Sequence, residues 1–226
     1  MRLTKFFLKT AAVLALSLCS SGVLAGDGIF ETEKNAFRVQ FPEGMCQASA
    51  DGPAEKRFLE YLSAALGKSL RLAAAAIPCD EREDFLKSGR NFPRHFSAAA
   101  LVGVDGSFGR FLLGKKVYFA LTSSFNPKDF SKTERRATRR LGKFGDAVSG
   151  IWVKKKGQAG DAIWFDAGGT ITHEGGAEDV LRVSAGSTLV SKHPFAAFYV
   201  TCGDEDLGKA MYRQAMPILK NIETVN

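Results

Sequence analysis

The chain has 226 residues and a formal net charge of +7, with 31 Lys and Arg against 24 Asp and Glu. This length is sufficient for one sizeable domain with its own hydrophobic core. Three of the basic residues and none of the acidic ones lie in residues 1–25, so residues 26–226 carry a net charge of +4. A charge this mild does not indicate a nucleic-acid-binding protein.

Residues 1–25 have the features of a secretory signal peptide. Basic residues precede the apolar run "TAAVLALSLCSSGVLA", and Val23 and Ala25 suit the −3 and −1 positions of a cleavage site. The run is shorter than the roughly 20 apolar residues that span a bilayer. The alternative is a lipoprotein, because Cys19 lies in the run, but Leu18 before it is larger than a lipobox requires. We expect cleavage after Ala25, a soluble protein exported to the periplasm or secreted, and no transmembrane segment in residues 26–226.

Three cysteines follow the predicted leader, at Cys46, Cys79 and Cys202. In an oxidising compartment two of them are expected to form a disulfide. Each cysteine ends a strand-like run, and Cys46 and Cys79 are nearest in sequence, so Cys46–Cys79 is the preferred pair. Pairs that include Cys202 are the alternatives. No His is near any Cys in sequence, so a catalytic thiol is not indicated.

The first elements alternate between strand and helix. The segment "FRVQF" (37–41) alternates apolar and polar residues, as a half-buried strand does. A helix is predicted over 53–66, a strand over "LRLAAAAI" (70–77), and a short helix over 80–86.

The middle of the chain predicts a β-meander followed by a long helix. The runs "FSAAALVGV" (96–104), "RFLLG" (110–114) and "VYFALTS" (117–123) are separated by short Gly-containing turns. A helix is predicted over 127–148, with Asn126 as its N-cap and Pro127 at its first position.

The last part predicts several strands and a terminal helix. The runs "IWV", "AIWFDA", "TITHE", "VLRVSA", "STLVS" and "FAAFYVTC" have the composition of strands, and a helix is predicted over 204–222. Strands joined by hairpins with helices at intervals indicate a single α+β domain over residues 26–226, with a mainly antiparallel sheet and three to four helices. The early strand with Phe37, Phe41 and Pro42, and the late helix, are similar to the PsbP/Mog1 architecture. This resemblance is one of element order and implies no function.

The stretch "WFDAGGTITHEGG" (164–176) resembles two phosphate-handling loops. In the D-x-D-x-T loop of haloacid-dehalogenase-like phosphatases the second Asp is essential, and Gly168 stands in its place here. Asp166 to Thr170 match the D-x-G-G-T loop of sugar kinases and actin-like ATPases, but only 56 residues follow Thr170, and an exported protein has no ATP. We therefore interpret residues 167–169 as a three-residue hairpin turn that places Asp166 opposite Thr170.

The same stretch supports the second of two functional hypotheses, a small exported hydrolase with a site near Asp166, His173 and Glu174. Adjacent residues of a regular strand point to opposite faces, so His173 and Glu174 are not expected to bind one metal ion. The sequence shows no paired carboxylates at a recognisable spacing and no Gly-x-Ser-x-Gly motif. No metal, cofactor or catalytic residue is predicted.

The first hypothesis rests on the segregation of basic charge. Between Lys128 and Lys156 there are ten basic and three acidic residues, a net charge of +7, so the rest of residues 26–226 sums to −3. This pattern indicates a non-catalytic binding or accessory protein that docks an anionic envelope component or an acidic protein through a basic helix over 128–143. The predicted docking residues are Lys132, Arg135, Arg136, Arg139, Arg140 and Lys143.

Overall fold

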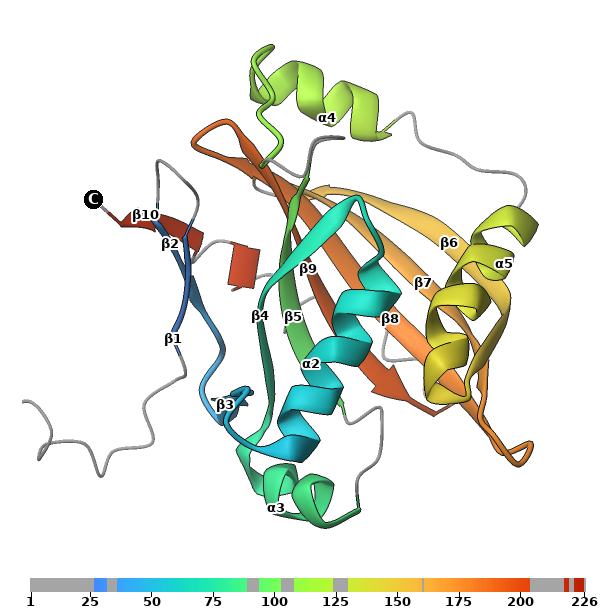
Figure 1. Ribbon diagram of the computed structural model, residues 1–226. Coiled ribbons are helices and arrows are strands. Elements are labelled where there is room, and N and C mark those ends of the chain that lie inside the picture. Colours follow the sequence, from blue (N-terminus) through green and yellow to red (C-terminus); the bar gives the residue numbers. More distant parts are fainter. Residues whose placement is uncertain are drawn as a thin grey trace, which may run out of the picture.

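A seven-stranded antiparallel sheet forms the centre of the molecule (Figure 1). The computed structural model describes residues 27–31, 36–88, 94–102, 108–123, 130–159, 161–203, 218–219 and 222–225. The strand order is β3-β4-β5-β9-β8-β7-β6. The strands are β3 (Met45–Gln47), β4 (Leu70–Pro78), β5 (His95–Leu101), β6 (Ala147–Ala159), β7 (Ala162–Thr172), β8 (Glu178–Val190) and β9 (His193–Cys202).

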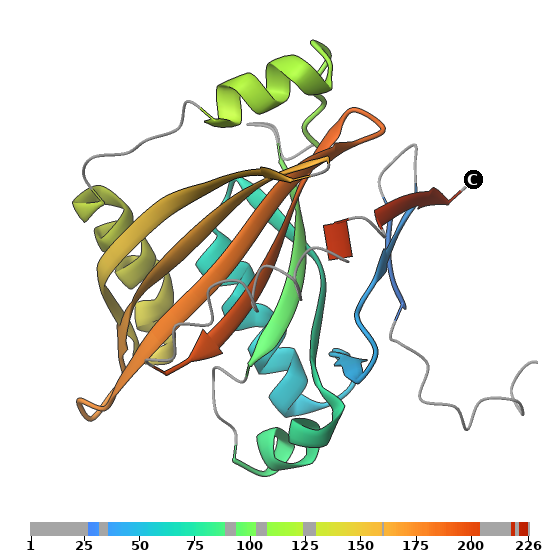
Figure 2. The ribbon, with the colours of Figure 1, turned by 180° about the vertical axis from the view of Figure 1, so that it is seen from behind.

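A second, three-stranded antiparallel sheet lies beside the first. It contains β1 (Asp27–Glu31), β2 (Ala36–Gln40) and β10 (Ile222–Val225), with β2 in the middle. Seen from behind, this sheet stands to one side of the long strands (Figure 2).

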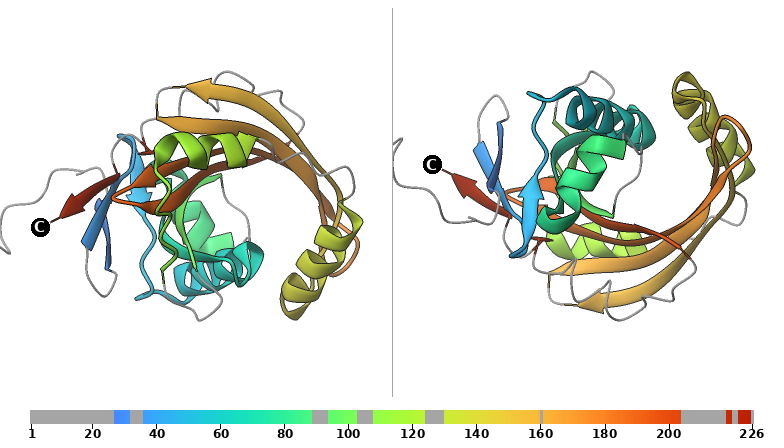
Figure 3. Two further views of the ribbon diagram at one scale, coloured as in Figure 1. Left: turned by 90° about the horizontal axis from the view of Figure 1, so that it is seen from above. Right: turned by 90° about the horizontal axis from the view of Figure 1, so that it is seen from below.

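The described helices are α2 (Pro53–Leu66), α3 (Cys79–Ser88), α4 (Lys115–Ser123) and α5 (Ser131–Leu141), with a 3-10 turn η1 (Gly142–Phe144) after α5. Views from above and from below show that the large sheet is strongly curved and that α2, α3 and α5 lie on its concave side (Figure 3). Helix α4 lies at the opposite end of the strands from α3 (Figure 1).

Hydrophobic side chains are buried on both faces of the large sheet, because successive residues of a strand point to opposite sides. In β4, Ala74 and Ala76 belong to a cluster that includes Phe37 and Val39 of β2 and Trp164 of β7. The intervening residues Ala75 and Ile77 pack against the helices instead, in a second cluster with Phe58 and Leu62 of α2 and Phe85 of α3. The large sheet is therefore the central layer of one α+β domain, as the sequence predicted.

Several predicted elements are confirmed at close to their predicted bounds. The strand predicted over 37–41 is β2, the helix over 53–66 is α2, the strand over 70–77 is β4 and the helix over 80–86 is within α3. In α2, Phe58 and Leu62 are four residues apart and both are buried. The amphipathic pattern therefore predicted the buried side of this helix correctly.

The predicted β-meander is wrong after its first strand. Residues 117–123 belong to helix α4, and residues 112–113 form a turn rather than a strand. The apolar run "VYFAL" fits either structure by composition, but the neighbours of β5 in the sheet are β4, which precedes it, and β9, much later in the chain. In the described residues, the segment that follows β5 pairs with its end through the Val102–Phe108 bridge and the hydrogen bond from Gly109 N–H to the Leu101 carbonyl.

The helix predicted over 127–148 is shorter than expected. Residues 124–129, which include the predicted N-cap Asn126, lie outside the described part of the chain, and α5 ends at Leu141. Gly145 after the 3-10 turn has φ +85°, a left-handed conformation that ends a right-handed helix. Strand β6 begins two residues later and includes Val148, which the helical pattern had counted as part of its stripe.

The hairpin turn predicted at residues 167–169 is also wrong, because β7 runs without interruption from Ala162 to Thr172. The chain turns instead at residues 173–177, where the His173 N–H donates to the Ala177 carbonyl over 2.8 Å and Gly175 and Gly176 have positive φ. A Cβ at Gly168 would lie 2.7 Å from both the Trp152 indole and the Leu181 carbonyl oxygen. Gly168 is thus required for the close approach of Trp152, not for a turn.

The predicted C-terminal helix is not shown. Residues 204–217, 220 and 221 lie outside the described part, and of the described residues in the predicted helix only Ile218 and Leu219 are helical. Ile222, the predicted last residue of the helix, begins β10 and pairs with Val39 of β2. The segment "IETV" has β-branched residues at three of four positions, which favour a strand.

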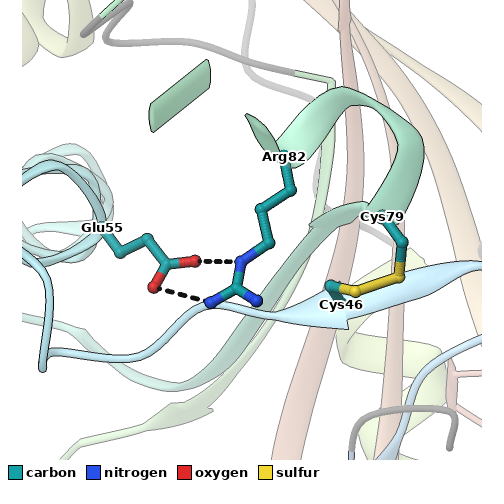
Figure 4. The surroundings of a disulfide bond; sticks show 4 residues. All are labelled: Cys46, Glu55, Cys79 and Arg82. Carbon is teal, nitrogen blue, oxygen red and sulfur yellow. Dashed lines mark hydrogen bonds and ion pairs between the residues drawn. A yellow bond between two sulfur atoms is a disulfide. The ribbon is translucent and has the colours of Figure 1, made fainter. Parts of the chain in front are cut away.

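The predicted disulfide between Cys46 and Cys79 is confirmed (Figure 4). It joins β3, at the edge of the large sheet, to the first residue of α3, with the two Cα atoms 4.9 Å apart. Beside it, Glu55 of α2 accepts hydrogen bonds from the Arg82 guanidinium of α3 at 2.8 and 3.2 Å. Cys202 at the end of β9 is exposed and is not in a disulfide.

We expect the disulfide to stabilise the fold by restricting the unfolded chain. The bond closes a loop with a sequence separation of 33, for which the chain-entropy relation gives about 3–4 kcal/mol. The double variant Cys46→Ala/Cys79→Ala should lose about this much unfolding free energy in urea denaturation. Cys202→Ala is the matched control. Equal stabilities of the double variant and the wild type would contradict a stabilising role for the bond.

We expect Gly168→Ala to destabilise the protein by about 1–3 kcal/mol, because the new methyl group meets a backbone carbonyl that cannot move aside without disturbing the β7–β8 pairing. Gly142→Ala is the control, since Gly142 has φ −56° and its Cβ would have no neighbour within 4 Å. Thermal unfolding of both variants measures the difference. If the two variants unfold at the same temperature, the close approach of Trp152 is not the reason for Gly168.

Candidate functional site

A chain of hydrogen-bonded polar side chains lies between α2, the start of β6 and the β7–β8 hairpin. The Tyr61 hydroxyl of α2 donates to Asp146 Oδ2 over 2.6 Å. Asp146 Oδ1 lies 2.9 Å from His173 Nδ1, and His173 Nε2 lies 2.9 Å from Asp179 Oδ2. Four residues from three separate parts of the sequence therefore form one continuous series of hydrogen bonds, Tyr61–Asp146–His173–Asp179.

The local structure explains how each member is placed. Tyr61 is on the same face of α2 as Phe58 and Leu62 and is fully buried. Asp146 follows the left-handed Gly145 and is 3% exposed. His173 and Asp179 are on either side of the turn at 173–177, so the hairpin brings them together.

The surroundings change the pKa values of two members. Burial lowers the pKa of His173, but hydrogen bonds to Asp179 and Asp146 and the charges of both carboxylates raise it, and the net pKa is above the ordinary value of 6.5. Burial, the hydrogen bond to Asp146 and nearby negative charge raise the pKa of Tyr61 well above its ordinary value. Tyr61 thus remains a hydrogen-bond donor, and the imidazolium form of His173 is favoured between its two carboxylates.

This geometry is suited to holding elements together rather than to proton transfer. A general base needs a nitrogen that reaches a substrate, and both ring nitrogens of His173 already lie 2.9 Å from carboxylate oxygens. The buried Asp146 carboxylate is hydrogen-bonded by Tyr61 at one oxygen and by His173 at the other, which offsets the cost of its burial. The chain of hydrogen bonds links α2 to the sheet through residues 146 and 173.

The three residues of the hydrolase hypothesis are not brought together. Asp166 is in β7, and His173 directly follows the last residue of that strand. The two residues are seven positions apart, which corresponds to about 23 Å in extended geometry. The odd separation also places them on opposite faces of the sheet. In the register of β7, Asp166 is opposite Lys154 of β6 and Ser184 of β8.

His173 and Glu174, by contrast, line the same open depression of about 620 Å³, together with Asp146. The expected divergence of the two side chains assumed regular strand geometry, whereas Glu174 is in the turn. Its carboxylate group lies against Gly145, where a Cβ would be 3.0 Å from Glu174 Oε2. Within the described residues, no group of three or more His, Cys, Asp and Glu side chains is arranged to hold a metal ion.

The predicted basic residues lie on α5 and the following turn, and most of them face outward. Lys132, Arg135, Arg136, Arg139 and Lys143 are exposed, and their spacing of three, four and seven residues places them along one side of the helix. Lys143 Nζ also lies 4.7 Å above the ring of Phe144. On the opposite side, Ala137 and Leu141 are buried.

Arg140 has a different environment from the other five. Its Nε donates to the Ala64 carbonyl over 2.8 Å and its Nη2 to the Ala65 carbonyl over 3.1 Å. These carbonyls belong to the last turn of α2, where a cation satisfies unpaired acceptors and the negative end of the helix dipole. Gly67, with φ +74°, leaves room for the guanidinium, since a Cβ there would lie 3.0 Å from Arg140 Cζ. Arg140 therefore joins α5 to α2.

The two described acidic residues of the same segment, Glu134 and Asp146, do not neutralise its exposed face. The Glu134 carboxylate accepts the Ile151 backbone N–H over 2.8 Å, and Asp146 is buried in the chain with Tyr61 and His173. In the described part of the protein, no carboxylate forms an ion pair with Lys132, Arg135, Arg136 or Arg139. The positive charges of these four residues are thus presented at the surface.

Sequence reasoning found His173 but missed most of its partners. Asp179 stands just beyond the glycine pair 175–176, so interpreting that pair as the turn would have placed Asp179 beside His173. Tyr61 and Asp146 are 85 residues apart, and nothing in the local pattern of either residue indicates the other.

Comparisons with known proteins give similar solved structures but no family. No family model matches the chain, and no curated protein matches it. The solution structure of the cyanobacterial PsbP protein CyanoP from Synechocystis sp. PCC 6803 is similar, with a TM-score of 0.40 and 9% sequence identity, over 93% of this chain and 99% of that chain. A similarity of this size assigns neither a function nor a site to the chain.

The helices in the described ranges include none that combines the length and the apolar character needed to cross a membrane.

We expect His173 to stabilise the fold more in mildly acidic solution than in mildly alkaline solution. Its pKa is raised in the folded state, so its contribution is fully present below the unfolded value of 6.5 and is lost as the pH rises through the folded value. The difference in unfolding free energy between the wild type and His173→Gln should therefore shrink from about pH 5.5 to about pH 9. Urea denaturation at intervals over this range measures it.

His193 titrates in both proteins of this comparison and cancels in the difference, although burial lowers its pKa and gives it the opposite trend. A stability difference that is independent of pH, or that grows with pH, would contradict the assignment of a raised pKa to His173.

Proposed function

We propose that this is an exported, non-catalytic binding or accessory protein that docks an anionic partner through the outward side of α5. The observation that carries the proposal is the charge distribution of this helix, in which four cations are exposed while the carboxylates of Glu134 and, beyond the helix, Asp146 are used in internal contacts. The docking residues are then Lys132, Arg135, Arg136, Arg139 and Lys143. Arg140, the sixth predicted residue, is assigned to the α2–α5 contact.

The basic surface extends beyond the helix. Lys143 and the exposed Arg57 of α2 line the depression that also contains His173. Because the pKa of His173 is raised by Asp146 and Asp179, the imidazolium form of His173 offsets part of the negative charge of these two carboxylates. Glu174 is the one carboxylate in this lining that is not part of the hydrogen-bonded chain.

The anionic partner in this proposal is a component of the cell envelope or an acidic protein. Near an anionic membrane surface each Lys or Arg contributes about 1 kcal/mol, so five residues on one side of a helix suffice for a specific orientation. Such an interaction weakens as salt screens the charges. Export is supported by the predicted signal peptide of residues 1–25 and by the Cys46–Cys79 disulfide, which is typical of oxidising compartments.

The test is charge reversal on the outward side of α5, in the variant Arg135→Glu/Arg136→Glu/Arg139→Glu. We expect binding of fluorescein-labelled heparin, used as a soluble polyanion, to weaken at least about tenfold at low salt, with a smaller difference at high salt. Fluorescence anisotropy measures the affinity. Arg140 is left unchanged, because its replacement would disturb the α2–α5 contact.

The matched control carries the same charge change on another surface, in the variant Lys56→Glu/Lys87→Glu/Arg94→Glu. All three of these side chains are exposed, and they belong to the first turn of α2, to α3 and to the residue before β5. The control should lose clearly less affinity for heparin. Equal losses in the two variants would attribute binding to net charge alone and would overturn the assignment to α5.

A further inference from the structure

An exposed apolar surface is formed by the turn before α4 and by one side of that helix. Leu112 and Leu113 in the turn are 72% and 70% exposed, and Val117 and Leu121 of α4 are 41% and 56% exposed. We refer to these four residues as the leucine surface. Val117 and Leu121 are one helical turn apart, so they share one side of α4.

Exposed apolar residues that stand singly are common and need no explanation, whereas a group of them marks an interaction site. Four of the seven large hydrophobic side chains that are exposed among the described residues belong to this short segment of ten residues. Helix α4 is at one end of the sheet, away from α2 and α3 (Figure 1).

The turn is held firmly, so the leucines do not face outward because of a loosely packed loop. The Phe111 N–H donates to the Lys192 carbonyl in the β8–β9 turn over 2.7 Å. Phe111 packs edge-on against Tyr118, with ring centroids 5.3 Å apart. Tyr118 in turn hydrogen-bonds Ser187 of β8 through its hydroxyl. The aromatic residues of the segment thus occupy the inward side, and the leucines are left on the outer side.

Backbone conformation at Gly114 reinforces this arrangement. Gly114 has φ +83°, which a residue with a side chain rarely adopts, and its carbonyl accepts the first helical hydrogen bond of α4 from the Tyr118 N–H. The turn at residues 112–113 is thus followed at once by α4. Both leucine side chains of this turn are exposed.

Basic residues surround the leucine surface. Arg110 precedes the turn, Lys116 is in the first turn of α4, and Lys192 is in the β8–β9 turn that holds Phe111; all three are exposed. Lys115 forms an ion pair with Asp161 over 2.7 Å. Exposed apolar and exposed basic side chains thus occur together in this part of the surface.

This composition favours a lipid surface over a protein partner. Protein–protein interfaces are depleted in Lys, whereas interfacial membrane-binding segments combine apolar side chains with Lys and Arg. The apolar side chains enter the acyl boundary while the cations contact anionic headgroups. A short segment of this kind binds reversibly, as a peripheral contact.

We propose that the leucine surface is a peripheral membrane-docking site for a bilayer that contains anionic lipids. Leu112 and Leu113 insert between headgroups, Val117 and Leu121 lie along the surface, and Arg110, Lys116 and Lys192 contact the lipid phosphates. The inference goes beyond the proposed function, because it concerns a different surface and does not depend on α5.

The test is cosedimentation of the protein, purified after export from a bacterial host, with vesicles of phosphatidylcholine and phosphatidylglycerol in equal parts. The variant Leu112→Ser/Leu113→Ser should lower the partition coefficient at least about tenfold, since it removes the side chains that enter the acyl boundary. Leu86→Ser is the matched control, because Leu86 of α3 is 43% exposed at the other end of the molecule. Replacing phosphatidylglycerol by phosphatidylcholine should also weaken wild-type binding.

Binding of the leucine variant to heparin distinguishes this proposal from the previous one, since a soluble polyanion has no acyl region and should bind the variant as it binds the wild type. Vesicle binding that is unchanged in the leucine variant overturns the proposal, whatever the result for α5. A loss that occurs equally in Leu86→Ser also overturns it. If sedimentation velocity instead shows a dimer that the leucine variant dissociates, the surface joins two copies of the chain, and the membrane proposal is wrong.

Discussion

The buried carboxylate of Asp146 is the constraint on which the arrangement of α2, α5 and the β7–β8 hairpin depends. A charged group that is 3% exposed requires close partners, and Tyr61 and His173 supply them from a helix and from a hairpin turn. Further polar contacts join α5 to its neighbours: Arg140 to the end of α2, and Glu134 and Thr138 to backbone groups of β6. Together these polar contacts determine which side of α5 faces the solvent.

The division of charge on α5 follows from this constraint. Side chains that complete a buried hydrogen bond or a helix end, such as Glu134 and Arg140, are used within the fold. The cations that remain, among them Arg135 and Arg139, have no ion-pair partner in the described part of the chain and give the helix its positive surface. The leucine surface before α4 has a comparable origin, because Phe111 and Tyr118 fill the inward positions and leave Leu112 and Leu113 outside. Both proposed docking surfaces therefore consist of side chains that the internal contacts of the fold do not use.

Much of the fold could be predicted from local patterns, and the errors have identifiable causes. Helix α2 and strand β4 follow from a Gly-bounded amphipathic run and a short apolar run, which depend on near neighbours in sequence. Gly168 was misinterpreted because a glycine that admits Trp152 from a neighbouring strand has the same sequence signature as a glycine that turns the chain. The candidate site could be predicted only in part, because nothing in the sequence near Tyr61 or near Asp146 indicates that the two residues are in contact.

The sequence by itself determined the α+β class, the disulfide pair preferred among three cysteines, and the segregation of positive charge onto one helix. These properties depend on composition, spacing and periodicity, which act over a few residues. Only the tertiary structure decided that Asp166 and His173 lie on opposite faces of the sheet, that Arg140 serves α2, and that Leu112 and Leu113 face outward. The physical reason is that a side chain's role depends on which partners satisfy its polar atoms and cover its apolar surface, and those partners come from segments far apart in the chain.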